Sequence, residues 1–204
     1  MSWGVLLCLV SGGALLALWA LFSAIRFIPN NRVGIVEKRF GLRGSLKSGL
    51  IALRGEAGFQ PKLLRGGIHL LVPFQYRVHI MPLITIPQGK IGYVFARDGL
   101  PLDSDQVLAR QVACSNYQDV AAFLQNGGQR QILREGTYAI NLAQFAVITE
   151  EGVFYLPLSR QEELTFRNMA AVIAERQGFQ PVIIKGADDM VGIVTVHDGL
   201  SLPQ

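Results

Sequence analysis

The stretch IPNNRVGIV, residues 28–36, occurs again in altered form as IPQGKIGYV, residues 86–94. Each copy begins with an Ile-Pro pair and continues into a short β-branched and apolar run with a glycine in its middle. Proline is tolerated where a strand begins, and glycine within a strand usually marks a bulge or the close approach of another group. A shorter third copy, MVGIV, covers residues 190–194. The sequence therefore predicts strands centred on Gly34, Gly92 and Gly192.

A second motif alternates with the first. LRGGIHLL, residues 64–71, resembles LREGTYAI, residues 133–140, and both read as a turn into an apolar strand. The two motifs thus follow each other twice, and the first then starts a third time shortly before Gln204. A strand unit without its partner cannot bury its apolar face. We therefore expect a duplicated β-rich module, and a chain that is the N-terminal fragment of a longer protein or a truncated product.

The remaining pattern adds short helices and further strands. Two helices are expected, at 115–125 and at 161–177, the second with Leu164, Met169, Val172 and Ile173 on one face. Further strands are expected at 78–86, 145–149, 153–158 and 181–184. The predicted fold class is α+β, with an N-terminal transmembrane helix before the duplicated region. The expected division is an anchor and its flank at 1–28, the duplicated region at 29–149, and a helix with the truncated repeat at 150–204.

The first 25 residues carry no charged side chain. Residues 5–25 would form a helix roughly 31 Å long, which matches a hydrocarbon core about 30 Å thick. A cleaved signal peptide fits less well, because no basic residue precedes the apolar run and the run exceeds the usual 7–15 residues. The residues expected to span the membrane include Val5, Leu9, Gly13, Leu16, Ala17, Trp19, Phe22 and Ile25.

Charge is distributed unevenly behind this segment. The net charge is +4, yet residues 26–97 hold twelve Lys and Arg against two acids, whereas residues 98–204 hold seven against thirteen. The positive-inside rule then places the N-terminus outside and the rest of the chain in the cytoplasm, at the inner or plasma membrane. These basic residues either set the topology alone or also contact anionic headgroups. The membrane-proximal basic residues are Arg26, Arg32, Lys38, Arg39, Arg43 and Lys47.

Taken together, IPNNRVGIVEKRFG (28–41), LRGGIHLLVPF (64–74) and LREGTYAINLAQF (133–145) behind an apolar N-terminus resemble one known family. This is the stomatin/prohibitin/flotillin/HflK-C superfamily, also called SPFH or band 7, and the likeness is greatest to bacterial flotillin-like inner-membrane proteins. The resemblance implies a membrane-bound scaffold that forms homo-oligomers and organises membrane microdomains. It also implies an NfeD-type membrane partner or a membrane protease as partners.

Signatures of catalysis are absent from the sequence. It contains no Gly-x-Ser-x-Gly elbow, no phosphate-binding Gly-x-x-x-x-Gly-Lys-Ser/Thr loop and no His-Glu-x-x-His zinc motif. Its two cysteines and three histidines do not have zinc-ligand spacing. We therefore expect no enzyme, cofactor or metal, and no nucleic-acid partner, since an Arg-rich helix and an aromatic stacking platform are lacking. The alternatives are an exported or periplasmic β-rich binding module with a cleaved signal, and a regulatory subunit of a membrane protease.

Overall fold

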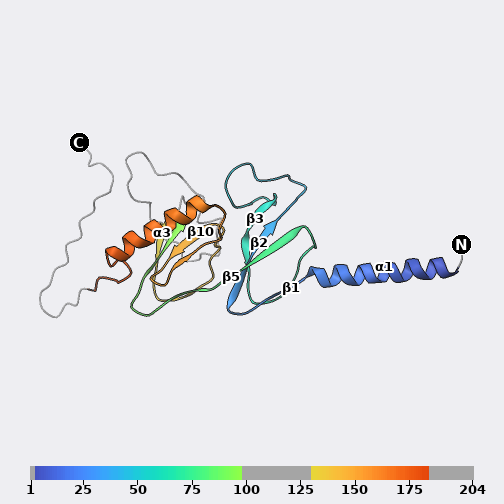
Figure 1. The fold of residues 1–204 in the computed structure, drawn as a ribbon, viewed down its shortest axis with the longest axis horizontal. Helices are drawn as coiled ribbons and strands as arrows, with labels where there is room; N and C mark the ends of the chain where they lie inside the picture. Colours follow the sequence, from blue (N-terminus) through green and yellow to red (C-terminus); the bar gives the residue numbers. More distant parts are fainter. Residues whose placement is uncertain (1–2, 98–129, 184–204) are drawn as a thin grey trace, which may run out of the picture. The chain divides into compact units, whose positions relative to one another are not determined.

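A computed structural model describes residues 3–97 and 130–183 and shows a mixed α+β chain (Figure 1). The chain divides into two compact units, residues 1–83 and residues 84–204. Each unit contains antiparallel strand pairs and one described helix. The predicted fold class is confirmed at this level.

The first unit begins with helix α1 and continues as five strands. Strand β2 lies at the centre of a three-stranded sheet in the order β3-β2-β5, and β1 pairs with β4 in a separate two-stranded ribbon. Figure 1 shows α1 leading away from β1, with the N-terminus at its far end. The elements are α1 (Trp3–Ala24), β1 (Ile25–Ile28), β2 (Arg32–Lys38), β3 (Gly58–Leu64), β4 (Gly67–Leu70) and β5 (Tyr76–Pro82).

The second unit contains six strands and a helix. Four strands form a sheet in the order β11-β10-β7-β8, β6 pairs with β9, and α3 packs on β10 and β11. The elements are β6 (Ile84–Ile86), β7 (Gly92–Ala96), β8 (Arg130–Leu133), β9 (Gly136–Tyr138), β10 (Phe145–Ile148), β11 (Val153–Phe154) and α3 (Arg160–Glu175).

The two units use the same strand pairings in the same order. In the ribbons, Ile28 lies opposite Gly67 and Ile86 lies opposite Gly136. In the sheets, Gly34 lies opposite Leu64, as Gly92 lies opposite Leu133. The central strand then pairs antiparallel on its other side as well, β2 with β5 and β7 with β10. Residues that match in the sequence thus take matching places in the two sets of pairings.

The matching glycines make the same close contact in both units. A Cβ atom added at Gly34 would lie 2.5 Å from Cδ1 of Ile28, and one added at Gly92 would lie 2.7 Å from Cδ1 of Ile86. Both isoleucines are almost fully buried. Glycine at the centre of each motif therefore lets the buried isoleucine of the ribbon pack directly on the backbone of the sheet.

The second motif is also repeated in local detail. Gly67 and Gly136 have φ of 131° and 140°, values that L side chains rarely adopt. Nε2 of His69 lies 2.7 Å from the carbonyl oxygen of Arg65, and the hydroxyl of Tyr138 donates to the carbonyl of Arg134 at 3.0 Å. A ring two residues after the glycine thus closes the same turn in both copies.

Helix α3 confirms the predicted helix and corrects its buried face. The side chain of Ser159 caps its N-terminus by accepting from the N–H of Glu162 at 3.2 Å. Phe166 is the buried residue of the helix, whereas Leu164 and Val172 are 63% and 46% exposed. The predicted apolar face was correct only in part: Met169 and Ile173 are half-buried, whereas Leu164 and Val172 are exposed, because the helix packs on the sheet through the adjacent face that carries Phe166.

One arginine ties α3 to the sheet of the second unit. The Arg97 side chain is 1% exposed and its guanidinium donates to the carbonyls of Leu142, Ala143 and Leu156 at 2.8–3.3 Å. It also donates to Oε2 of Glu162 at 2.6 Å. A buried charge in this position is stabilised because several acceptors and one carboxylate surround it.

Several predicted bounds need correction. The strand predicted at 78–86 is two strands, β5 and β6. They are separated at Leu83, whose N–H bonds to the carbonyl of Asn31 at 3.3 Å. At this residue the chain passes from the first unit into the second. Residues 181–183 are not a strand, and β11 ends at Phe154 rather than at Leu158. The predicted helix at 115–125 and the third repeat with Gly192 lie outside the described residues.

The predicted anchor is helical over Trp3–Ala24 and ends one residue before Ile25, which begins β1. Among the residues that the structure describes, we find no helix with the length and apolar character needed to cross a membrane. Insertion of α1 into a bilayer therefore stays a prediction.

Candidate functional site

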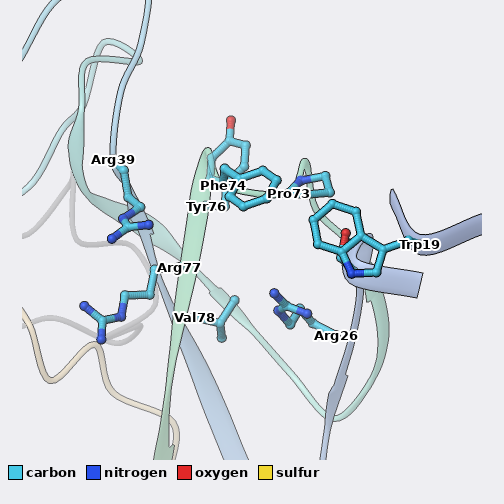
Figure 2. Close-up of a pocket in the computed structure, with 9 residues that line it drawn as sticks. Trp19, Arg26, Arg39, Pro73, Phe74, Tyr76, Arg77 and Val78 are labelled. Atoms are coloured by element: carbon cyan, nitrogen blue, oxygen red, sulfur yellow. The ribbon is translucent and has the colours of Figure 1, made fainter. Parts of the chain in front are cut away.

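A hollow of about 420 Å³ lies in the first unit where the C-terminal part of α1 meets the residues before and within β5. No loop separates α1 from β1. The N–H of Leu71, which follows β4, bonds to the carbonyl of Ala24 at the end of α1 at 2.9 Å. Figure 2 shows the rings of Phe74 and Tyr76 at the upper centre and that of Trp19 at the right, with Arg39 and Arg77 at the left and Arg26 below. Its lining consists of Trp19, Ser23, Arg26, Arg39, Pro73, Phe74, Tyr76, Arg77 and Val78.

A strained turn places the aromatic rings. The N–H of Gln75 bonds to the carbonyl of Pro73 at 2.7 Å, and Phe74 between them has a φ of 63°, the left-handed region that favours glycine. Non-glycine residues held in this region cost about 1–3 kcal/mol and cluster at functional sites. The turn brings the Phe74 ring within 5.8 Å of the Trp19 ring, centroid to centroid. Phe74 and Trp19 are 64% and 57% exposed, so this aromatic side is open to a partner.

The other side of the hollow is basic. Arg26, Arg39 and Arg77 are all exposed, and the only described bond of their guanidinium groups is from Nη1 of Arg26 to the carbonyl of Ile25 at 3.1 Å. The acids of the first unit are engaged elsewhere. Glu37 bonds to Nε2 of His79 at 2.7 Å, and Glu56 accepts from the N–H of Arg54 at 2.9 Å.

Backbone N–H groups lower the pKa of Glu56. The N–H of Glu56 itself and then that of Arg54 hold the pKa of the Glu56 carboxyl below its usual value.

None of the nine residues that line the hollow is acidic. The hollow therefore offers positive charge and apolar surface together, a combination that suits an anion with an apolar part.

The ribbon next to this hollow has one apolar face that is exposed. Phe27 lies opposite Ile68 and Ile25 lies opposite Leu70, and residues directly opposite in an antiparallel pair share a face. Phe27, Ile68 and Leu70 are 66%, 72% and 71% exposed. Exposed apolar patches of this kind mark sites of interaction with proteins or membranes.

The structure distributes the predicted site residues among several places. Of the predicted basic residues, Arg26 and Arg39 line the hollow, whereas Lys38 bonds to the carbonyl of Gly55 at 2.8 Å and Arg43 to that of Arg54 at 2.6 Å. Arg32 begins β2, and Lys47 is exposed in the segment before β3. Trp19 is the predicted membrane-spanning residue that lines the hollow. Of the others, Ile25 lies in β1, and Val5, Leu9, Gly13, Leu16, Ala17 and Phe22 lie on α1.

Sequence reasoning missed Arg77, Phe74 and Tyr76. They lie about fifty residues after the end of α1, just before the strand that was predicted at 78–86. Their approach to Trp19 depends on the pairing of β1 with β4, which a single sequence does not specify. The signal that was present is the aromatic and basic cluster PFQYR at residues 73–77.

The described residues contain no group of three or more His, Cys, Asp or Glu side chains that could hold a metal ion. Comparison with models of protein families, with curated proteins and with solved structures found no match to this chain.

Proposed function

We propose that this protein is a non-enzymatic, membrane-anchored scaffold of the SPFH type, which uses α1 and the β1–β4 ribbon to hold its paired β-rich units at a bilayer. The observation that carries the proposal is a pair of exposed apolar elements adjacent in the chain, the uncharged helix α1 and the ribbon face with Phe27 and Ile68. Ten Lys and Arg against two acids follow within residues 26–83.

Physical arguments support the bilayer as the partner of these elements. Over Trp3–Ala24 the helix α1 carries no charged side chain that would oppose its transfer into hydrocarbon. Leu15, Leu16 and Phe22 on this helix are 67–71% exposed. Because exposed apolar groups favour transfer out of water, α1 and the ribbon gain free energy from entering the bilayer together.

The basic residues support an orientation. Arg26 follows α1 after a single residue, and Arg39 and Arg77 lie at the same end of the helix around the hollow. Positive charge is retained on the cytoplasmic side of membrane segments. In the proposed topology the N-terminus is outside, and both β-rich units are cytoplasmic at the inner or plasma membrane.

The SPFH assignment also implies assembly. In the proposed role, several copies associate in the membrane and gather client proteins, with an NfeD-type membrane protein or a membrane protease among the partners. The paired units with equivalent glycines Gly34 and Gly92 support a repeated β-rich module of this kind.

Alkaline carbonate extraction tests the anchor. The wild-type chain is expected to stay in the membrane pellet. Leu16→Arg should move it toward the supernatant, because an arginine at the centre of a membrane helix costs about 2.5–3.5 kcal/mol. Phe40→Ser is the matched control, since Phe40 is 57% exposed in the first unit but lies on neither α1 nor the ribbon. Release of the wild-type chain by carbonate would contradict the anchor.

Cross-linking in intact membranes tests assembly independently. An amine-reactive cross-linker should capture homo-oligomers of the wild-type chain at its natural level of expression. A chain that stays in the carbonate pellet yet remains monomeric in this experiment would leave the anchor in place and contradict the scaffold.

A further inference from the structure

The hollow at the end of α1 combines features that select one class of ligand. Its charged groups are the guanidinium groups of Arg26, Arg39 and Arg77, and its apolar groups include Trp19 and Phe74. We propose that this hollow is a binding site for the headgroup of an anionic phospholipid, with the arginines on the phosphate and the aromatic rings beside the first carbons of the acyl chains. This inference rests on the proposed membrane anchor and gives it a lipid preference.

Arginine suits this role by its geometry. Its planar guanidinium presents several N–H donors in a fork that matches the oxygens of a phosphate. In the described part of the chain, Arg39 and Arg77 form no ion pair with an acidic side chain, so their donors are available to a ligand. The negative end of the α1 dipole lies nearby, and three guanidinium groups outweigh its partial charge of about half an electron.

The aromatic side determines where such a ligand comes from. Tryptophan rings concentrate at the interface between hydrocarbon and headgroups. Trp19 lies five residues before the end of α1, so an α1 that spans the bilayer brings the hollow to the level of the headgroups. The volume of about 420 Å³ lies within the range of small-molecule sites, roughly 300–1,000 Å³. A free phosphate ion would use the arginines and leave the aromatic rings exposed.

Fluorescence quenching by brominated lipids tests this site, because the chain has only two tryptophans. The Trp3→Phe variant leaves Trp19 as the probe at the hollow, and Trp19→Phe leaves Trp3 as the probe at the other end of α1. Each full-length variant is reconstituted in vesicles, and quenching by brominated phosphatidylglycerol is compared with quenching by brominated phosphatidylcholine. For Trp19 we expect phosphatidylglycerol to be preferred by about fivefold or more, and for Trp3 we expect no preference.

Charge variants separate the site from general attraction. In the Trp3→Phe background, replacing Arg26, Arg39 and Arg77 with glutamine should abolish the preference at Trp19. The matched control replaces Lys47, Lys62 and Arg65 with glutamine, which removes the same charge from exposed positions of the same unit outside the hollow. Preference that falls equally in the control would overturn the inference, because the lipid would then respond to net charge alone.

The remaining outcomes distinguish the inference from the proposed function. Equal quenching of Trp19 by both lipids would overturn the headgroup site and leave the anchor standing. No quenching of either tryptophan by any brominated lipid would contradict the anchor, and the site with it. A shift of Trp19 emission on adding inorganic phosphate to phosphatidylcholine vesicles, absent from the arginine variant, would assign the hollow to a soluble phosphate and overturn the lipid.

Discussion

The close contact between Gly34 and Ile28 gives the sharpest prediction about the fold. In Gly34→Ala, the added Cβ would lie 2.5 Å from Cδ1 of Ile28, 2.9 Å from Cγ1 of Val78 and 3.3 Å from Cβ of Leu64. Ile28 is fully buried and has no free space to move into. Overpacking costs about 1–3 kcal/mol, and alanine in a strand recovers about 0.5–1 kcal/mol relative to glycine. We expect a net loss of about 1–2 kcal/mol.

A double-mutant cycle isolates the cause. Ile28→Val removes Cδ1, the atom nearest the new methyl group, and alone costs about 0.5–1.5 kcal/mol. In the combined variant the methyl group that Gly34→Ala adds occupies part of the space that Cδ1 leaves. The double variant should therefore be about 1 kcal/mol more stable than the sum of the single changes predicts.

Hydrogen exchange of the reconstituted full-length chain is the appropriate assay, because peptides from β2 and β5 report the opening of the first unit separately. The same cycle at Gly92 and Ile86 provides an internal comparison. Among the described residues, Cδ1 of Ile86 at 2.7 Å is the one close contact there, since the next atoms lie at 3.5 and 3.6 Å. Gly92→Ala should cost less than Gly34→Ala, and Ile86→Val should restore most of the loss. Additive effects in both units would refute the packing argument.

Three further predictions concern single side chains. Arg97→Lys should destabilise the second unit by about 3 kcal/mol in urea unfolding. One ammonium cannot reach three carbonyls and Glu162 at once, and buried acceptors left unpaired cost about 1–3 kcal/mol each. An unchanged unfolding midpoint would contradict a stabilising role of the Arg97 hydrogen bonds. Ser159→Ala should cost about 0.5–2 kcal/mol and speed exchange in the first turn of α3, whereas Ser159→Asp should retain the cap; equal exchange in all three proteins would argue against capping. The pKa of Glu56 is lowered in the folded chain, so its stabilising effect is present above pH 4.5 and is lost as the pH falls through the lowered value. Glu56→Gln should therefore flatten the acid limb of the unfolding midpoint against pH, and identical acid limbs would show that the Arg54 contact contributes nothing.

The repeated motifs were the most informative part of the sequence. Gly34 and Gly92 lie in central strands of equivalent pairings, as expected from glycine within a β-branched run. The sequence does not show why glycine is needed at these positions, because the close contact comes from Ile28 and Ile86 in a different sheet.

Long-range pairing accounts for most of what sequence reasoning missed. The β1–β4 ribbon joins residues about forty positions apart, and the sequence of either strand does not predict which strand it pairs with. The hollow depends on the same kind of pairing, since the β1–β4 ribbon and the bond from the N–H of Leu71 to the carbonyl of Ala24 bring the segment before β5 to the end of α1. Residues 181–183 were taken for a strand from apolar character alone, and no described strand offers them a ladder.

Site-specific labelling in intact cells is the most direct test of the account. In a chain with Cys8 and Cys114 replaced by alanine, Ser2→Cys places one thiol before α1, and Lys47→Cys places one at an exposed position after it. A membrane-impermeant maleimide should label residue 2 in intact cells, and residue 47 only after the membrane is permeabilised. Labelling of residue 47 in intact cells, equal to that after permeabilisation, would contradict a chain that α1 holds with its β-rich units in the cytoplasm.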